Sequence, residues 1–422
     1  MPLAAVSVVV LLAVATGILQ GYASLARQTI QDRGMEDFGL FYASARQHLN
    51  HNSLYGPLLK PGTRRASDAR NLNPPYVNLV FLPFAMLPPR LALLGWLLLN
   101  LCALGDSARI AAREGIWKPL SLGGLAAGVF LLAWAPMAAL VITAQLALLV
   151  MWLVTRAWWA ARRGDWDRAG WWIGTAAATK LFLLVFIPYL VLRRQWGALG
   201  AAAFQMVLLV AAGALVFGPD AYLDWLRQFG EVTWQGHYMN ASWWGMLERA
   251  LHGSPVYRSL WSGAWYVPLA WAVGAALVLT LTCVRLARAG TRDVDFSFAL
   301  LIAAALLASP LGWVYYFWLG VVPLAAWVRS TRPLSAGTLF MALVLATAAL
   351  WHASATIWLQ PSGLATITVG SVYFWALFGT WAWLMTLHVE RGRADSEPER
   401  ATAPQELQVA RSVPSMPSVT GT

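Results

Sequence analysis

The chain has 422 residues, of which 59% are hydrophobic and only 12% are charged, and its mean hydropathy is +0.57. Soluble globular proteins carry about 25% charged residues, so this composition excludes a soluble protein and indicates one embedded in a membrane. The net charge of +11 does not indicate a nucleic-acid partner, because no basic run is interleaved with polar and aromatic residues. We expect the arginines to lie in short loops and to contact anionic lipid headgroups.

Residues 4–25 are apolar and form the first predicted span, which we expect to be retained because no basic segment precedes it. A polar segment, 26–75, follows. Residues 77–87 are apolar but too short to cross a bilayer, and Pro88 and Pro89 separate them from a span that runs to about Arg109. The sequence therefore predicts an interfacial or re-entrant helix over 77–87.

Five short clusters of basic residues divide the rest of the chain, and they begin at Arg109, Arg156, Arg193, Arg285 and Arg329. A hydrophobic stretch between successive clusters must leave one side of the membrane and return to it. We expect three such stretches: 120–155 with a bend near Pro136, 169–192 hinged near Lys180, and 296–328 bent at Ser309 and Pro310.

Basic loops face the cytoplasm, which places the polar loops 26–75 and 218–257 outside. Loop 26–75 is itself basic, but the rule applies weakly to long loops. A last pair of spans is expected at 334–351 and 371–388. The prediction is an all-α polytopic protein of the inner (plasma) membrane with about 10–12 transmembrane or re-entrant helices. Residues 1–390 form the membrane domain, and 391–422, rich in Pro, Ser, Glu and Thr, a disordered cytoplasmic tail.

Polar residues at membrane depth are candidates for function because they are costly there. The adjacent acids Glu36 and Asp37 follow the first span, Gln145 interrupts an apolar run, and Lys180 lies at a predicted hinge. A glutamine in a span more often makes an interhelical hydrogen bond. Cations suit a phosphate, and a carboxylate suits the hydroxyl of an acceptor. The six histidines lack the spacing of metal ligands, and we expect no metal or other cofactor.

Several motifs occur in an order that resembles glycosyltransferase family 87, a family of polytopic enzymes of the GT-C class. The first polar segment contains Asp37-Phe38-x-x-Phe41-Tyr42-x-Ser44-Ala45, then Leu54-Tyr55 and Asn73-Pro74-Pro75 with Tyr76. The later motifs are Ala144-Gln145-Leu146, Gly174-x-x-Ala177-x-x-Lys180, Asn240-Ala241-Ser242 with Arg249, and Ser309-Pro310-x-x-Trp313. The resemblance covers residues 37 to about 323.

This resemblance implies a GT-C fold and the transfer, with inversion and without a metal, of mannose or another sugar from a polyprenyl-phosphate donor at the outer face of the membrane. Asp37 would be the catalytic base. The acceptor would be a hydroxyl of a glycolipid, a polysaccharide or a protein. The implied substrate-binding residues are Tyr42, Tyr55, Asn73, Tyr76, Gln145, Lys180, Asn240, Ser242, Arg249, Trp313, Tyr315 and Tyr316.

The chain departs from the family pattern at Tyr315 and Tyr316, where many relatives have paired histidines, and at Ala144 and Leu146 beside Gln145. Phenols carry no charge at neutral pH, so this turn offers no cation to a donor phosphate. Two other functions stay open: a transporter or flippase for lipid-linked saccharides, which also uses broken helices, and a non-catalytic scaffold. A transporter does not need a carboxylate such as Asp37 in an outer loop.

Overall fold

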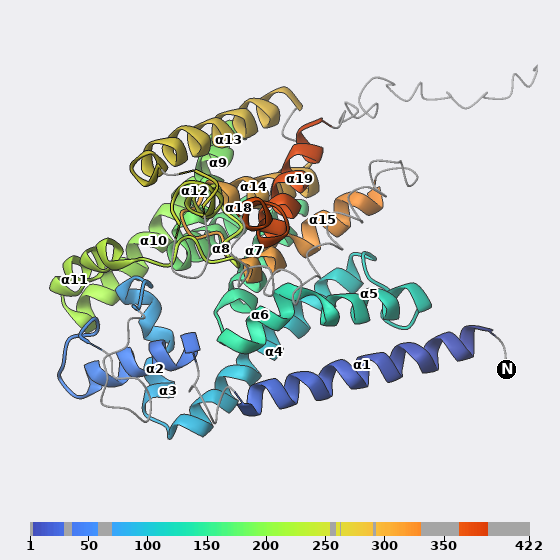
Figure 1. Ribbon diagram of the computed structural model, residues 1–422, viewed down its shortest axis with the longest axis horizontal. Helices are drawn as coiled ribbons and strands as arrows, with labels where there is room; N and C mark the ends of the chain where they lie inside the picture. The colour runs from blue at the N-terminus through green and yellow to red at the C-terminus, as the bar shows by residue number, and fades with distance from the viewer. Residues whose placement is uncertain are drawn as a thin grey trace, which may run out of the picture. The chain divides into compact units, whose positions relative to one another are not determined.

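The structure, a computed structural model, describes residues 3–28, 36–57, 70–253, 259–261, 263–289, 293–330 and 363–386. Within these residues the regular elements are helices, and none is a strand (Figure 1). The chain is an all-α polytopic membrane protein, as predicted. Five helical segments there are long and apolar enough to cross a membrane: Ala5–Leu25, Pro89–Arg113, Trp196–Phe217, Val267–Arg288 and Gly363–Thr386. The expected span at 334–351 and the tail at 391–422 lie outside the described residues.

The first helix, α1 (Leu3–Gln28), packs against α5 (Leu122–Ala133) and α6 (Ala135–Thr143) (Figure 1). Helices α5 and α6 together are apolar enough to form a sixth span, but they meet at an angle of 51°. Pro136 lies in the first turn of α6, where its missing N–H group is tolerated. The structure thus has the bend predicted near this proline.

The apolar stretch after the first polar segment forms two short helices, η2 (Pro75–Val80) and α3 (Leu82–Ala85), before the long helix α4 (Pro89–Arg113) begins. Helix η2 is fixed to the rest of the protein by Tyr76, whose hydroxyl donates a hydrogen bond of 3.0 Å to the carbonyl oxygen of Ala178. Neither short helix is long enough to cross a membrane.

Helix α8 (Trp166–Thr179) packs against both α7 (Ala147–Arg162) and α10 (Trp196–Phe217). Two glycines on α8 permit a close approach to α10: a Cβ atom on Gly170 or Gly174 would lie 2.1 Å or 2.5 Å from a carbonyl oxygen of α10. Such spacing of small residues is a common way to pack membrane helices. After α8 the chain turns at Lys180 into η3 (Leu181–Val185) and α9 (Phe186–Leu192), which confirms the predicted hinge.

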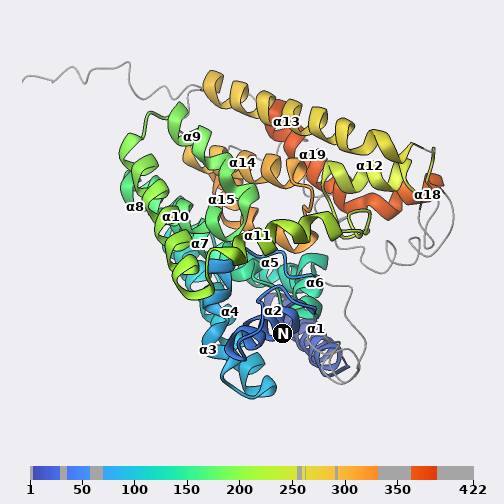
Figure 2. The same ribbon diagram turned by 90° about the vertical axis from the view of Figure 1, so that its left-hand side faces the viewer.

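The C-terminal half is built around α14 (Val294–Ala308), which is buried along its length. It packs against α13 (Val267–Ala289), α15 (Trp318–Ser330) and α19 (Val372–Thr386) (Figure 2). The other helices that the structure describes in this half are α11 (Asp220–Gln228), η4 (Phe229–Glu231), α12 (Trp243–Leu251), η5 (Ala264–Tyr266), η6 (Val314–Phe317), α18 (Gly363–Ile367) and η7 (Val369–Ser371). The chain breaks after Ala308, which agrees with the bend predicted at Ser309 and Pro310.

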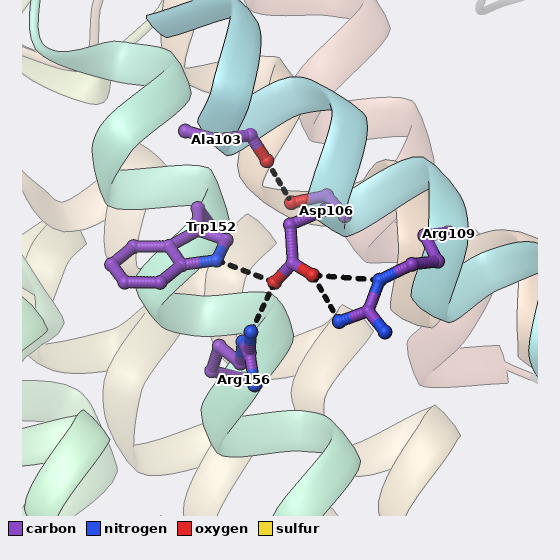
Figure 3. A network of polar contacts seen from close by, with 6 residues as sticks. Ala103, Asp106, Arg109, Trp152 and Arg156 are labelled. Carbon is purple, nitrogen blue, oxygen red and sulfur yellow. Dashed lines mark hydrogen bonds and ion pairs between the residues drawn. The ribbon is translucent and has the colours of Figure 1, made fainter. Parts of the chain in front are cut away.

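A carboxylate of α4 is held by side chains of α7 (Figure 3). Asp106 accepts a hydrogen bond of 2.8 Å from the indole of Trp152 and forms an ion pair of 2.5 Å with Arg156, and it also pairs with Arg109 of its own helix. Trp152 and Arg156 are four residues apart on α7, so they lie on the same face of the helix. The guanidinium of Arg156 also lies over the ring of Trp152.

The same spacing of tryptophan and arginine occurs twice more on α7. Each further pair contacts one carboxylate that lies in a neighbouring helix or directly after it. Each arginine again lies over its tryptophan. Trp159 and Arg163 contact Glu114, which follows α4, while Trp158 and Arg162 contact Asp295 of α14. These three arginines bind carboxylates and so join α7 to α4 and α14, a role that the sequence does not predict. The expected contacts of arginines with lipid headgroups stay a prediction.

We predict that replacing Asp106 with asparagine lowers the free energy of unfolding by about 1–3 kcal/mol, because the half-buried guanidinium of Arg156 loses its charged partner. Unfolding of the purified protein in detergent would measure this change. Asp224→Asn is the matched control: it breaks an ion pair with Arg227 in which the side chains are 36% and 74% exposed. We expect this control to change the unfolding free energy by less than about 0.5 kcal/mol. Equal effects of the two variants would contradict the prediction.

Candidate functional site

Asp37 is the second residue of α2 (Glu36–Leu49). Negative charge is favoured in the first turn of a helix by the helix dipole and the unpaired N–H groups. The next residue, Phe38, is fully buried, and its ring stacks on that of Trp96 with the ring centroids 5.7 Å apart. This packing fixes the start of α2 and with it the position of the carboxylate.

Gln145 lies in the break between α6 and α7 and donates a hydrogen bond of 2.6 Å from Nε2 to Oδ2 of Asp37. Its Oε1 accepts a hydrogen bond from the backbone N–H of Leu146 at 3.1 Å, which sets the orientation of the amide. The break itself depends on Ala144, which adopts a left-handed conformation at φ 48° and ends α6. The carbonyl oxygen of Ala144 accepts a hydrogen bond of 2.8 Å from the indole of Trp96. Trp96 therefore fixes both Asp37 and its partner.

Lys180 lies at the end of α8, outside the candidate spans, and its ammonium is enclosed although the residue as a whole is half-buried. Its Nζ donates a hydrogen bond of 2.8 Å to Oδ1 of Asn73 and lies 5.7 Å from the centroid of the Tyr316 ring. Burial lowers the pKa of this lysine to about 8, against an opposing effect from the negative charge of Asp37. The ammonium and the carboxylate of Asp37 thus act on each other electrostatically.

The turn that follows α14, residues 309–316 (the late turn), brings Tyr315 and Tyr316 of η6 to the same site. Burial raises the pKa of both phenols well above their ordinary value, and the carboxylate of Asp37 raises it further, so both stay protonated and neutral. The side chain of Gln145 interacts with Tyr315 by a hydrogen bond that partly opposes this shift. Two neutral phenols therefore lie beside Asp37, Gln145 and Lys180.

Three other tyrosines from the predicted site use their hydroxyls to hold the backbone together. Tyr42 donates to the carbonyl oxygen of Leu87 at 2.9 Å, and Tyr55 donates to that of Asn73 at 2.6 Å. Tyr76 donates to α8, as described above. These contacts make the three tyrosines supports of the polar segment.

The second outer loop, residues 218–257, contains three of the predicted substrate-binding residues. These are Asn240, Ser242 and Arg249, and all three are fully buried. The amide of Asn240 donates two hydrogen bonds, to the carbonyl oxygens of Gln235 and Pro310, and accepts two, from the backbone N–H groups of Ser242 and Gly312. The backbone of Asn240 also forms a bridge with Trp313. Asn240 therefore joins this loop to the late turn.

The other two residues stabilise the same junction. The hydroxyl of Ser242 accepts a hydrogen bond of 3.1 Å from the backbone N–H of Gly245 and so caps the start of α12. The guanidinium of Arg249 donates to the carbonyl oxygens of His237 and Asn240, and to the hydroxyl of Ser371. The structure gives all three residues contacts within the protein.

Sequence reasoning missed two residues beside the site, His237 and Trp96. His237 packs edge-on against Trp313 with the ring centroids 5.8 Å apart, and Trp313 in turn stacks on Tyr315 at 6.2 Å. Burial, and then the positive charge of Arg249, lower the pKa of His237 to about 4, so it is neutral at physiological pH. No pattern in the sequence marked either residue, because both depend on contacts between distant segments.

The described residues hold no group of three or more His, Cys, Asp or Glu side chains placed to bind a metal ion. A surface hollow of about 380 Å³ is lined by His48, Leu49, His51 and Asn52 at the far end of α2. At 1.5 Å per helical residue it lies roughly 16 Å from Asp37, so it is separate from the cluster around the carboxylate.

The chain matches the family model described as glycosyltransferase family 87 over residues 71–310, more than half of its length. The matched region contains Asn73, Gln145, Lys180 and the second outer loop, whereas Asp37 and the tyrosines of the late turn lie outside it. Searches of curated proteins and of solved structures find no match.

We predict that Asn240→Ala loosens the junction between the second outer loop and the late turn, because the buried backbone N–H groups of Ser242 and Gly312 lose their acceptor. Hydrogen exchange would show it: the amides of Ser242 and Gly312, which donate to Oδ1 of Asn240, should exchange on the order of tenfold faster or more. Gln235→Ala is the control, since it keeps the carbonyl that Asn240 contacts. Unchanged exchange in Asn240→Ala would show that the amide is dispensable.

Proposed function

The chain belongs to glycosyltransferase family 87, and from this premise we propose that it transfers a sugar from a polyprenyl-phosphate donor to the hydroxyl of an acceptor, with inversion. The observation that carries the proposal is the pairing of one oriented carboxylate, Asp37, with one enclosed ammonium, Lys180, at breaks between helices. The family itself establishes a glycosyltransferase in a membrane; the donor, the stereochemistry and the residue roles are proposed.

Asp37 acts as the general base in this scheme. Its carboxylate takes the proton of the acceptor hydroxyl while the hydroxyl oxygen attacks the anomeric carbon of the donor sugar. The bond between the anomeric carbon and the phosphate oxygen breaks, and polyprenyl phosphate leaves with the bonding electrons. A single displacement of this kind inverts the anomeric configuration. The hydrogen bond from Gln145 keeps the carboxylate in one orientation.

Lys180 stabilises the negative charge that develops on the leaving phosphate. An ammonium enclosed in a low-dielectric site interacts with a phosphate more strongly than one in water. Tyr315 and Tyr316 are neutral, so they contribute hydrogen bonds and packing but no charge that would attract or repel the phosphate. Mannose is one candidate for the transferred sugar, together with other hexoses and pentoses, and the acceptor is a glycolipid, a polysaccharide or a protein.

We propose further that the site faces the outside of the inner (plasma) membrane. The paired arginines of α7 and the basic ends of α4 and α13 mark the cytoplasmic side by the positive-inside rule. Gln145 lies before the start of α7, at the end opposite to Arg162 and Arg163.

A transporter of lipid-linked saccharides is the second candidate, supported by the break at Lys180 and the bent pair α5 and α6.

Asp37→Asn should reduce transfer of a labelled sugar from a polyprenyl-phosphate donor by on the order of a hundredfold or more, because the amide cannot accept the proton. Transfer would be measured in membranes at equal protein levels. Asp220→Asn, which alters an exposed carboxylate at the start of α11, should leave transfer unchanged. Full activity of Asp37→Asn would exclude this residue as the base. Movement of the lipid-linked sugar across the membrane without transfer by the unaltered protein would favour the transporter.

The pKa of about 8 for Lys180 gives the donor affinity a pH dependence. As pH rises through this pKa the free protein loses the ammonium charge, so the KM for the donor should rise between pH 7 and pH 9, by about tenfold for each pH unit above the pKa. Lys180→Arg keeps its charge over this range and should show little change of KM with pH. The measurement is the KM of both proteins across this pH range. An identical pH profile for the two would remove Lys180 from donor binding.

A further inference from the structure

The side-chain amide of Asn73 has one half paired and the other half unpaired. The residue is only 2% exposed, and its Oδ1 accepts the hydrogen bond from Nζ of Lys180 at 2.8 Å. Its Nδ2 is buried and has no hydrogen-bond partner among the residues that the structure describes. A buried donor without an acceptor is costly and rare in proteins, so it calls for an explanation.

The residue cannot turn to satisfy this group within the protein. Its backbone N–H donates to Oδ1 of Asn71 at 3.1 Å, and its carbonyl oxygen accepts from the hydroxyl of Tyr55 at 2.6 Å. Asn71 is fixed in turn by a hydrogen bond of 2.8 Å to Asn78. Rotating the amide by half a turn would place its NH₂ group against the ammonium of Lys180, which has only donors. The amide is therefore held with Oδ1 toward Lys180 and Nδ2 directed elsewhere.

We propose that Nδ2 of Asn73 donates a hydrogen bond to a non-bridging phosphate oxygen of the lipid-linked donor, beside the ammonium of Lys180. Both groups supply only donors, and a phosphate oxygen is an acceptor that can take hydrogen bonds from both. A sugar hydroxyl would also need an acceptor for its own proton, which neither group provides. This inference rests on the proposed function for the identity of the lipid, but the phosphate subsite itself can be tested without any transfer.

The proposal gives Asn73 two roles in the site. Through Oδ1 it positions the ammonium of Lys180, and through Nδ2 it binds the same phosphate that the ammonium neutralises. Burial in advance of binding also means that little side-chain freedom is lost when the phosphate arrives. Lys180 is oriented by the amide of Asn73 and packs on the ring of Tyr316. It then supplies the positive charge for the phosphate, because the late turn offers no cation.

The test is binding of sugar-free polyprenyl phosphate to the purified full-length protein in lipid nanodiscs, compared with binding of the matching polyprenyl alcohol. Asn73→Asp keeps an oxygen toward Lys180 and replaces the NH₂ donor with a second oxygen. We expect its Kd for the phosphate to rise by about tenfold to a hundredfold, and its Kd for the alcohol to stay unchanged. Asn73→Ala, which also removes the contact to Lys180, should weaken phosphate binding in the same way.

Three other outcomes overturn the proposal, and a fourth separates it from the proposed function. Unchanged phosphate binding would show that the amide does not contact the phosphate, and equal weakening for phosphate and alcohol would show a structural role. Weakened binding of the sugar-bearing donor alone would assign Nδ2 to the sugar. If the unaltered protein transfers no sugar but phosphate binding still depends on Asn73, the proposed function fails while the phosphate subsite stands.

A second measurement reads the response of Asn73 directly in the unaltered protein. In the unaltered protein with ¹⁵N-labelled asparagine, the side-chain NH₂ signal of Asn73, assigned by its absence from Asn73→Asp, should shift downfield and exchange more slowly with solvent when polyprenyl phosphate is added. Asn78, whose amide is paired on both sides by Asn71 and the carbonyl of Pro74, provides the reference signal. A response of Asn73 no larger than that of Asn78 would contradict the proposal.

Discussion

The hydrogen bond of 2.6 Å between Gln145 and Asp37 is the contact on which the arrangement of the site depends. It joins α2, which lies within the first polar segment, to the break between α6 and α7, and these two parts of the chain are distant in sequence. Trp96 supports both partners, because it stacks on Phe38 and donates to the carbonyl of Ala144. This bond gives the carboxylate of Asp37 a defined direction.

The functional candidates lie where helices begin or end. Asp37 is in the first turn of α2, Gln145 follows α6, Lys180 ends α8, and Tyr315 lies in the turn after α14. A helix break inside a membrane protein must be covered by other protein groups that satisfy its backbone. The breaks in this protein are supported by side chains such as Tyr76 and Asn240, which donate to carbonyl oxygens of α8 and of the late turn.

Charge is distributed differently at the two ends of α7. From Trp152 to its carboxyl-terminal end the helix carries the tryptophan and arginine pairs, which hold carboxylates of α4, of the residue that follows α4, and of α14. Near its start, the carboxylate of Asp37 and the ammonium of Lys180 are surrounded by amides and neutral phenols. Ion pairs therefore secure the helices at one end, while the other end keeps the polar groups that the proposed chemistry requires.

The sequence was sufficient to predict the features that depend on local composition: the all-α class, the breaks near Pro136, Lys180 and Ser309, and the family. The family model confirms the resemblance over 71–310. The sequence did not reveal contacts between distant segments, such as the bond from Lys180 to Asn73 or the support from Trp96. For the same reason the carboxylate partners of the α7 arginines were not predicted, because nothing in the spacing of these arginines shows that α4 and α14 present carboxylates to them.

The role of Asn240 illustrates the same limit. Its motif is part of the family resemblance and led to its prediction as a substrate-binding residue, yet the structure surrounds its amide with backbone groups of two loops. A residue that holds a site together and a residue that contacts substrate leave the same mark in a sequence motif. Only the hydrogen-bond partners of the amide distinguish the two.

The measurement that tests the central claim most directly is the anomeric configuration of the product. A polyprenyl-phosphate sugar of known configuration would be supplied to the purified protein, and the new glycosidic bond would be examined by NMR. A single displacement assisted by one carboxylate predicts the configuration opposite to that of the donor. Retention of the donor configuration would contradict the account, because a single displacement from the face opposite the leaving phosphate cannot retain it.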